Sequence, residues 1–308
     1  MMKYKLGIDL GGTKTSIVVL NQGNQAVYNK RLPTPAKNYT ETLKTIQRLV
    51  HHAQQGIPDL DAQIIGVGIP GALQQDNITV KNANLQILID KTLKSDLKNI
   101  LQRNVIIAND ANCFAASEAT DGSAKGHALV FGAILGTGVG GGIAIMGKPW
   151  EGPNCLAGEW GHNPFPFHGA NAKHRSCYCG KSDCIEKIIS GPALSQDYFE
   201  QTGKHKSVEQ IADAKAAGDP IATCLLNNFY LNLAKALSSV INLLDPNVIV
   251  LGGGLSNIAE IYHEVPKLWE TYVFNATGKK PNIATKLVKN KWGDDSGVRG
   301  AAWLADTK

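Results

Sequence analysis

The sequence predicts an α/β fold made of two related halves with a cleft between them, and two observations carry this prediction. A pair of short β-rich runs joined by a glycine-rich turn occurs near the start of each half. The rest of the chain alternates between strand-like apolar runs and segments with helical periodicity, which is typical of an α/β protein. The paired runs are residues 5–10 with 15–20, and residues 128–135 with 143–146.

The other elements follow from local signals. Apolar runs that end at turn residues predict buried strands, and apolar side chains at steps of three and four predict a long core helix that Asp245 and Pro246 end. We therefore expect strands at 64–69, 105–108 and 248–251, helices at 111–119 and 226–244, and a final helix that begins at Ser296.

The composition limits the class of protein. The 308 residues are enough for two domains, and 43% hydrophobic with 19% charged residues is the balance of a globular protein. The net charge of +5 comes without aromatic residues interleaved among the lysines, so we expect no nucleic-acid partner. The start has no leader pattern and the sequence has no run of about 20 apolar residues, so we expect no membrane partner. The clustered cysteines favour metal binding in a reducing cytoplasm over disulfides.

The first glycine-rich turn follows a strand that ends at Asp9. Gly11 and Gly12 allow backbone N–H groups to approach phosphate oxygens, and Thr13 and Lys14 add a hydroxyl and a cation. Asp9 would organise Mg²⁺ on such phosphates. The same residues also suit a tight hairpin in which glycine supplies a positive φ, so this turn alone leaves both interpretations open.

A second and a third glycine cluster favour the phosphate interpretation. Five of the seven residues at 136–142 are glycine, and Thr137 adds a hydroxyl. Residues 252–254 are all glycine and follow another expected strand, where α/β folds place ligands. Three such turns suit one extended anion with an attached ring.

Asp110 is the candidate general base. Phosphoryl transfer needs a carboxylate within hydrogen-bond reach of the attacking hydroxyl. Asp110 lies between an expected strand end and an expected helix start, which suits a side chain that projects into a cleft. The alternative is that Asp110 caps the helix, and its position alone favours the cap.

Cysteine spacing gives the strongest signal. Cys177, Cys179 and Cys184 stand in a C-x-C-x₄-C pattern, with His162 fifteen residues upstream of the first. Three thiolates and one imidazole complete a tetrahedral structural zinc site. Glu159 lies three residues before His162, and Glu186 lies two residues after Cys184. A metal would fix both carboxylates, which could then accept hydrogen bonds from the hydroxyls of a ligand; exposed glutamates are the alternative.

Together these motifs resemble the ROK family of sugar kinases and repressors, within the actin-like ATPase superfamily, and the similarity runs from Ile8 to Trp303. The resemblance implies a two-domain actin-like (ribonuclease H-like) fold. It implies a small domain at 1–118, joined by a C-terminal helix at 294–306, and a large domain at 119–293. It also implies ATP, Mg²⁺ and Zn²⁺ as cofactors, a hexose as substrate, and a homodimer.

The same resemblance implies roles for individual residues, with Asp110 as the catalytic base. The zinc ligands match His162, Cys177, Cys179 and Cys184. The implied sugar contacts are Asn84, Asn109, Asp110, Glu159, His162 through its other ring nitrogen, and Glu186. The implied nucleotide contacts are Asp9, Gly11, Gly12, Thr13, Lys14, Gly136, Thr137, Gly138, Gly140, Gly253 and Gly254.

The sugar is predicted from three segments, residues 81–84, 158–164 and 177–180, which most resemble the bacterial fructokinase branch. We therefore expect ATP-dependent 6-phosphorylation of fructose, with mannose as a further substrate because members of that branch also accept it. An N-acetylglucosamine kinase or a glucokinase of the same family is the alternative. A repressor or a non-catalytic sugar-binding protein is disfavoured because Asp110 and both phosphate turns are retained, and because Asp9 lies too close to the start for a preceding DNA-binding domain.

Overall fold

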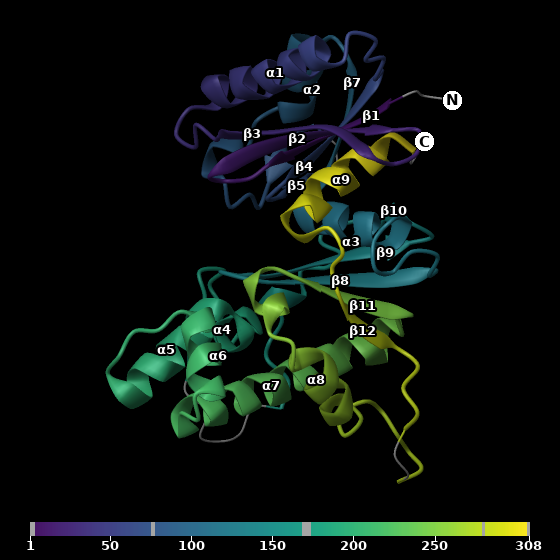
Figure 1. Cartoon of the computed structure of the whole chain (residues 1–308). Helices are drawn as coiled ribbons and strands as arrows, with labels where there is room; N and C mark the ends of the chain where they lie inside the picture. The colour runs from purple at the N-terminus through teal and green to yellow at the C-terminus, as the bar shows by residue number, and fades with distance from the viewer. Residues whose placement is uncertain (1–3, 75–77, 168–173, 279–280, 307–308) are drawn as a thin grey trace. The chain divides into compact units, whose positions relative to one another are not determined.

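The computed structural model describes residues 4–74, 78–167, 174–278 and 281–306, and within them two five-stranded β-sheets are flanked by helices (Figure 1). Contacts divide the chain into two units. Unit 1 comprises residues 1–132, 142–158 and 291–308, and unit 2 comprises residues 133–141 and 159–290. The expected domains, 1–118 with 294–306 and 119–293, stay a prediction about folding units.

The first sheet lies in unit 1 and has the strand order β3-β2-β1-β4-β7. β1 pairs antiparallel with β2 and parallel with β4, and β4 pairs parallel with β7. The register puts Asp9 opposite Gly68 and Gly68 opposite Ala108, so the carboxyl ends of three neighbouring strands meet at one edge. The strands are β1 Tyr4–Leu10, β2 Lys14–Asn21, β3 Ala26–Pro33, β4 Ile64–Ile69 and β7 Asn104–Asn109.

Helices cover both faces of this sheet, and strand β2 shows the consequence. Ile17 and Val19 join the apolar cluster that includes residues of α1 (Tyr39–Gly56) and α2 (Leu93–Leu101). Val18 and Leu20 point to the opposite face and pack with α9 (Ser296–Trp303). Side chains alternate along a strand, so burial on both faces explains why β2 is a continuous apolar run.

Glycines bring α9 into backbone contact with its neighbours. A Cβ on Gly66 would lie 1.7 Å from the Ala301 carbonyl oxygen, and a Cβ on Gly300 would lie 1.7 Å from the Cys113 carbonyl oxygen. Strand β4 and helix α3 (Asp110–Thr120) can therefore approach α9 only because these positions lack a side chain. The predicted final helix is confirmed, and it begins at Ser296 as expected.

The second sheet has the order β10-β9-β8-β11-β12, and the division between the units falls within β8 and β9. Its glycine-rich turn is shorter than predicted, because β9 begins at Val139 and the glycines at 140–142 are strand residues. A Cβ on Gly142 would lie 2.0 Å from the Ala111 carbonyl oxygen, so this strand glycine permits a close approach to α3. The strands are β8 Leu129–Leu135, β9 Val139–Ile145, β10 Lys148–Pro149, β11 Val248–Gly252 and β12 Lys286–Lys289.

The remaining helices belong to unit 2, and the longest has clear boundaries. Asp219 caps α7 by accepting hydrogen bonds from the N–H groups of Ile221 and Ala222, and Asp245 ends it in a left-handed conformation. The predicted core helix is thus confirmed and starts earlier than expected. The helices are α4 Glu186–Ile189, α5 Gly191–Thr202, α6 Val208–Ala216, α7 Pro220–Leu244 and α8 Ile261–Trp269. The two-residue strands β5 (Ala72–Leu73) and β6 (Val80–Lys81) pair in unit 1.

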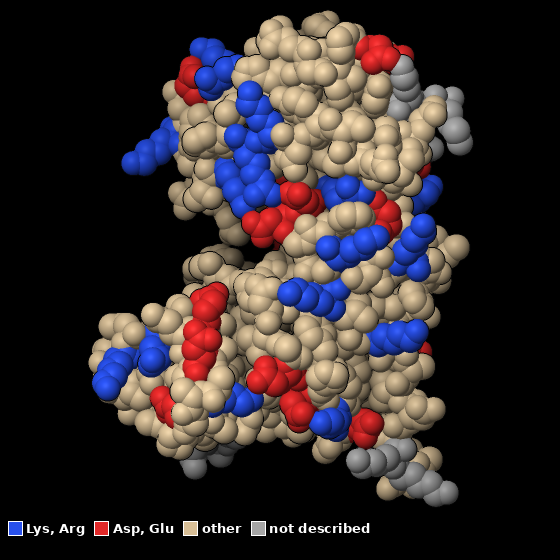
Figure 2. Space-filling model, viewed as in Figure 1, with Lys and Arg blue, Asp and Glu red and all other residues tan. Residues whose placement is uncertain are grey.

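On the face drawn in Figure 2, Lys and Arg side chains are interspersed with Asp and Glu. In the part of the chain that the structure describes, no helix is both long and apolar enough to cross a membrane. The expected lack of a nucleic-acid partner stays a prediction.

Candidate active site and metal centre

The first glycine-rich turn is a tight hairpin with an open outer side. The Gly11 N–H donates to the Lys14 carbonyl oxygen (3.0 Å), and Thr34 Oγ1 donates to the Gly11 carbonyl oxygen (2.8 Å). Neither Gly11 nor Gly12 has a positive φ. Among the described residues nothing lies within 4 Å of a Cβ built on Gly12, so neither conformation nor packing requires glycine there. The remaining explanation for glycine at position 12 is that it lets a ligand approach the backbone closely.

Thr13 and Lys14 of this turn differ in their contacts with the rest of the protein. Thr13 is exposed, and its carbonyl oxygen accepts a hydrogen bond from the Thr34 N–H (2.9 Å). Lys14 Nζ lies 3.0 Å from Asp294 Oδ2, so its ammonium is paired within unit 1. A phosphate that recruits Lys14 would therefore compete with Asp294.

Asp9 lies at the end of β1 between two glycines. A Cβ on Gly68 would be 3.7 Å from Asp9 Oδ1, and a Cβ on Gly297 would be 3.5 Å from Asp9 Oδ2. Burial raises the pKa of Asp9 from 3.8 to about 6, although the charges of Lys14 and Arg31 act in the opposite direction. A carboxylate whose ionised form is disfavoured gains most from a nearby cation, which suits a role in organising Mg²⁺.

The raised pKa predicts a pH-dependent gain in stability for Asp9→Asn. The folded protein holds the Asp9 proton more tightly than the unfolded chain, so this group destabilises the fold increasingly as pH rises from about 4 through about 6. Removing the charge should raise the free energy of unfolding by about 1–3 kcal/mol at pH 7.5, and by roughly half as much at pH 5. Urea unfolding of both proteins without Mg²⁺ at the two pH values measures this. A variant that is no more stable than the wild type at pH 7.5 would contradict the prediction.

The start of α3 separates the roles of two adjacent side chains. Asn109 Oδ1 accepts hydrogen bonds from the N–H groups of Ala111 (2.9 Å) and Asn112 (3.3 Å), so Asn109 is the N-cap. The alternative interpretation of Asp110 as the cap is therefore wrong. Asp110 is the first residue of the helix, and its Oδ1 accepts the Ala111 N–H (2.8 Å). The first turn of a helix is a favourable position for an acidic side chain.

Asp9 and Asp110 come together at the edge where β1, β4 and β7 end. A Cβ on Gly68 would be 3.7 Å from Asp9 Oδ1 and 3.8 Å from Asp110 Cα. The Asp9 carboxylate and the backbone of Asp110 thus lie on either side of Gly68, although the two residues are about 100 positions apart in sequence.

The loop that carries Asn84 packs against the same edge. The Asn84 N–H donates to the Pro70 carbonyl oxygen (2.8 Å), and Asn109 Nδ2 donates to the Gly71 carbonyl oxygen (3.2 Å). The Asn84 side chain is exposed. Both polar atoms of the Asn109 side chain are used within the protein, so Asn109 has a structural role that sequence reasoning did not assign.

In unit 2 the second turn and the third glycine cluster lie side by side. Gly253 has a positive φ of 77°, and a Cβ on it would lie 2.4 Å from the Leu135 carbonyl oxygen. The Gly136 N–H donates to the Gly138 carbonyl oxygen (3.0 Å), which closes the turn, and Thr137 is exposed at its tip. The structure therefore brings together Gly136, Thr137, Gly138, Gly253 and the adjoining Gly254, whereas Gly140 lies inside β9.

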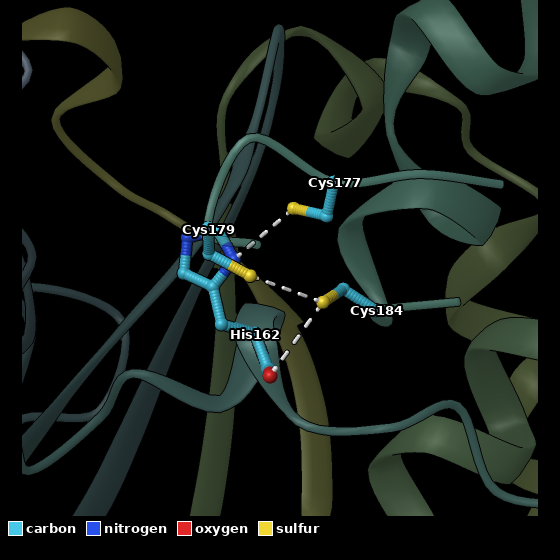
Figure 3. Close-up of side chains that lie close together, drawn as sticks. All are labelled: His162, Cys177, Cys179 and Cys184. Atoms are coloured by element: carbon cyan, nitrogen blue, oxygen red, sulfur yellow. Dashed lines mark hydrogen bonds between the residues drawn. The ribbon is translucent and has the colours of Figure 1, made fainter. Parts of the chain in front are cut away.

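The four expected metal ligands cluster (Figure 3). Their ligand atoms all lie within 4.8 Å of one another. Cys177 Sγ is 3.6 Å from His162 Nδ1, and Cys179 Sγ is 3.6 Å from Cys184 Sγ. A tetrahedron with metal–sulfur bonds of about 2.3 Å has edges of about 3.8 Å, so these separations fit a zinc ion. All six cysteines lie in the described residues and none forms a disulfide.

Two contacts next to the cluster were missed by sequence reasoning. His162 Nε2, the nitrogen expected to face the sugar, lies 2.9 Å from Tyr178 Oη, and the Tyr178 side chain is largely exposed. Glu186 Oε2 accepts the Val139 N–H (3.0 Å), so one oxygen of an expected sugar ligand holds the second glycine-rich turn. Glu159 is exposed. The only local signal for the contact between His162 and Tyr178 was the position of Tyr178 between two cysteine ligands.

Residues 5–308 match the family described as the ROK family. The chain belongs to the ROK family. An N-acetyl-D-glucosamine kinase of Yersinia pseudotuberculosis serotype O:1b (strain IP 31758) is 38% identical over 305 residues, which cover 97% of each protein. An N-acetyl-D-glucosamine kinase of Vibrio vulnificus (strain YJ016) is 40% identical over 303 residues, which cover 97% of this chain and 98% of that one.

Solved structures confirm the expected fold of this ROK protein. A ROK family glucokinase from Streptomyces griseus, in complex with glucose and AMPPNP, aligns with a TM-score of 0.79 and 25% identity, over 99% of this chain and 100% of that one. The two-domain actin-like ATPase fold predicted from the sequence is therefore confirmed. The prediction that this ROK protein is most similar to fructokinases is corrected, because relatives that match along nearly the whole chain are named N-acetyl-D-glucosamine kinases.

Proposed function

We propose that this protein is an ATP-dependent sugar kinase that phosphorylates N-acetyl-D-glucosamine. The observation that carries the proposal is the Asp110 carboxylate at the N-terminus of α3, at the strand edge where Asp9 also lies. The full-length relatives named N-acetyl-D-glucosamine kinase support the choice of substrate.

Each group then has a distinct role in phosphoryl transfer. Asp110 accepts the proton of the attacking sugar hydroxyl, while Asn109 keeps the start of α3 in place. The backbone N–H groups of the turns at 11–13 and 136–138 bind phosphate oxygens, and Lys14 exchanges Asp294 for a phosphate. Asp9 would hold Mg²⁺, which supplies charge neutralisation on the phosphates. Gly253 and Gly254 would lie beside the adenosine, and Gly254 leaves open space there, whereas Gly253 allows the close approach of Leu135.

The metal cluster would support sugar binding through residues that lie next to the metal ligands. His162, Cys177, Cys179 and Cys184 would hold Zn²⁺ as a closed structural shell, which leaves no position for substrate chemistry. His162 bound through Nδ1 carries its hydrogen on Nε2, so Nε2 donates either to Tyr178 Oη or to a sugar hydroxyl. Glu159 and the second oxygen of Glu186 accept from further sugar hydroxyls.

Fructose is the second candidate substrate. It rests on three segments that resemble the fructokinase branch, and two of them, 158–164 and 177–180, carry three of the four metal ligands. The segments that the fructose prediction uses are therefore close to the expected sugar contacts, whereas the whole-chain comparison averages over every position.

A comparison of substrates tests the assignment. With saturating ATP and Mg²⁺, we expect the highest kcat/KM for N-acetyl-D-glucosamine among four sugars, the others being fructose, mannose and glucose. ADP release coupled to a reporter enzyme measures each rate, and a reaction without sugar gives the background hydrolysis. A kcat/KM for fructose that is tenfold or more above that for N-acetyl-D-glucosamine would show that the local segments, and not the whole-chain similarity, report the substrate.

The cysteines indicate the cellular setting of the reaction. Free cysteines suit a reducing cytoplasm. The homodimer remains an expectation of the family resemblance, and size-exclusion chromatography with light scattering measures it.

A further inference from the structure

We propose that the metal centre positions the second glycine-rich turn through Trp160 and Glu186, and so supports nucleotide binding as well as sugar binding. The inference rests on the proposed kinase function, in which residues 136–138 bind ATP phosphates. Trp160, Glu186 and this turn all lie in unit 2.

Trp160 contacts the start of β9, directly after the turn. It begins the short 3₁₀ turn Trp160–His162, two residues before a metal ligand. Its indole is 5% exposed, and Nε1 donates to the Gly140 carbonyl oxygen (2.8 Å). A Cβ on the next residue, Gly161, would lie 2.0 Å from the Val139 carbonyl oxygen, so the backbone before His162 packs directly on the start of β9.

Glu186 contacts the end of the turn and the first residue of β9. It lies two residues after Cys184 and is 8% exposed. Its Oε2 accepts the Val139 N–H (3.0 Å), and a Cβ on Gly138 would be 2.7 Å from that same oxygen. A larger residue at Gly138 would displace this carboxylate, so the turn and Glu186 fit each other as one unit.

A metal ion would join the segment that carries Trp160 to the segment that carries Glu186. His162 belongs to the segment with Trp160, Cys184 belongs to the segment with Glu186, and their ligand atoms lie in one cluster. Two backbone hydrogen bonds, from the Ile185 N–H to the Asn163 carbonyl oxygen (3.0 Å) and from the Phe165 N–H to the Asp183 carbonyl oxygen (2.8 Å), form a β-bridge that also joins the segments. These contacts remain when the metal is lost. We therefore expect the turn to become more mobile but to stay folded, and nucleotide affinity to fall moderately.

The cleanest test removes one donor and keeps the packing. Trp160→Phe deletes the hydrogen bond to Gly140, and Trp303→Phe is its matched control, because the Trp303 indole is also buried but its Nε1 has no hydrogen-bond partner among the described residues. Calorimetric titration with the non-hydrolysable ATP analogue AMPPNP should give a Kd about three- to tenfold higher for Trp160→Phe, the effect of one lost hydrogen bond. Trp303→Phe should stay within about twofold of the wild type, and metal analysis should show unchanged zinc in both variants.

A second pair of variants keeps the test valid if Trp160→Phe does not fold. Glu186→Gln retains an acceptor for the Val139 N–H and should bind AMPPNP within about threefold of the wild type, whereas Glu186→Ala should weaken binding about tenfold or more. Chelation of the wild-type protein should raise the AMPPNP Kd, and chelation of Trp160→Phe should add less, because both changes act on the same contact.

The outcomes separate this inference from the proposed function. If Trp160→Phe and Glu186→Ala bind AMPPNP as the wild type does, the positioning role is overturned while the kinase assignment stands. If the wild type binds no AMPPNP and phosphorylates none of the four sugars, the kinase assignment fails and this inference fails with it.

Discussion

Asp110→Asn should lower kcat by roughly 10²–10⁴-fold while leaving sugar and nucleotide binding nearly unchanged. Asn has the same size, and its side-chain oxygen can still accept the Ala111 N–H, so the start of α3 should keep its structure. What the variant loses is a base for the sugar hydroxyl. Steady-state kinetics of the preferred sugar, together with calorimetric Kd values for sugar and AMPPNP, measure the separation between catalysis and binding.

The control for Asp110→Asn is the same substitution at another helix N-terminus. Asp219 caps α7, and Asn is as good a cap as Asp, so Asp219→Asn should retain wild-type kcat. An Asp110→Asn variant that keeps half of the wild-type kcat would remove Asp110 from the catalytic role.

Cys179→Ser, or chelation of the wild-type protein, should reduce sugar affinity about 10²-fold or more. Structural zinc contributes directly to local folding, and Glu159 and Glu186 lie beside the metal ligands. Two hydrogen bonds from the sugar to carboxylates are each worth about 1.5–3 kcal/mol, and their loss gives a change of this size. Trp160 and Glu186 also bind the start of β9, directly after the second turn, so nucleotide affinity should fall too, but by the smaller factor expected for one or two backbone contacts.

Metal analysis of freshly purified protein and titrations before and after chelation measure this effect. Cys224→Ser is the matched control, because Cys224 is exposed and lies outside the cluster. Less than about half a zinc ion per chain, or an unchanged sugar Kd after verified metal removal, would contradict the structural role of zinc.

The sequence by itself determined the features that depend on neighbouring residues. The cysteine spacing predicted the metal cluster because three of its four ligands lie within eight residues, and the structure brings their sulfur atoms together. The strand–turn–strand pattern predicted β1 and β2, and turn residues after apolar runs placed Asp9 and Asp110 at strand ends. Periodicity and turn chemistry act over a few residues, so one sequence is enough to detect them.

The tertiary structure decided which partner each side chain has. Sequence position favoured Asp110 as the cap of α3, but Asn109 is the N-cap and Asp110 is the first residue of the helix. Glycines 140–142 belong to a strand, and Gly142 allows the close approach of Ala111, which the glycine count did not show. Glu186 reaches Val139 across 47 residues of sequence, and Trp160 reaches Gly140 across 20. Such contacts depend on how distant segments pack, and no local pattern encodes them. For that reason the link between the metal centre and the second glycine-rich turn emerged only from the folded chain.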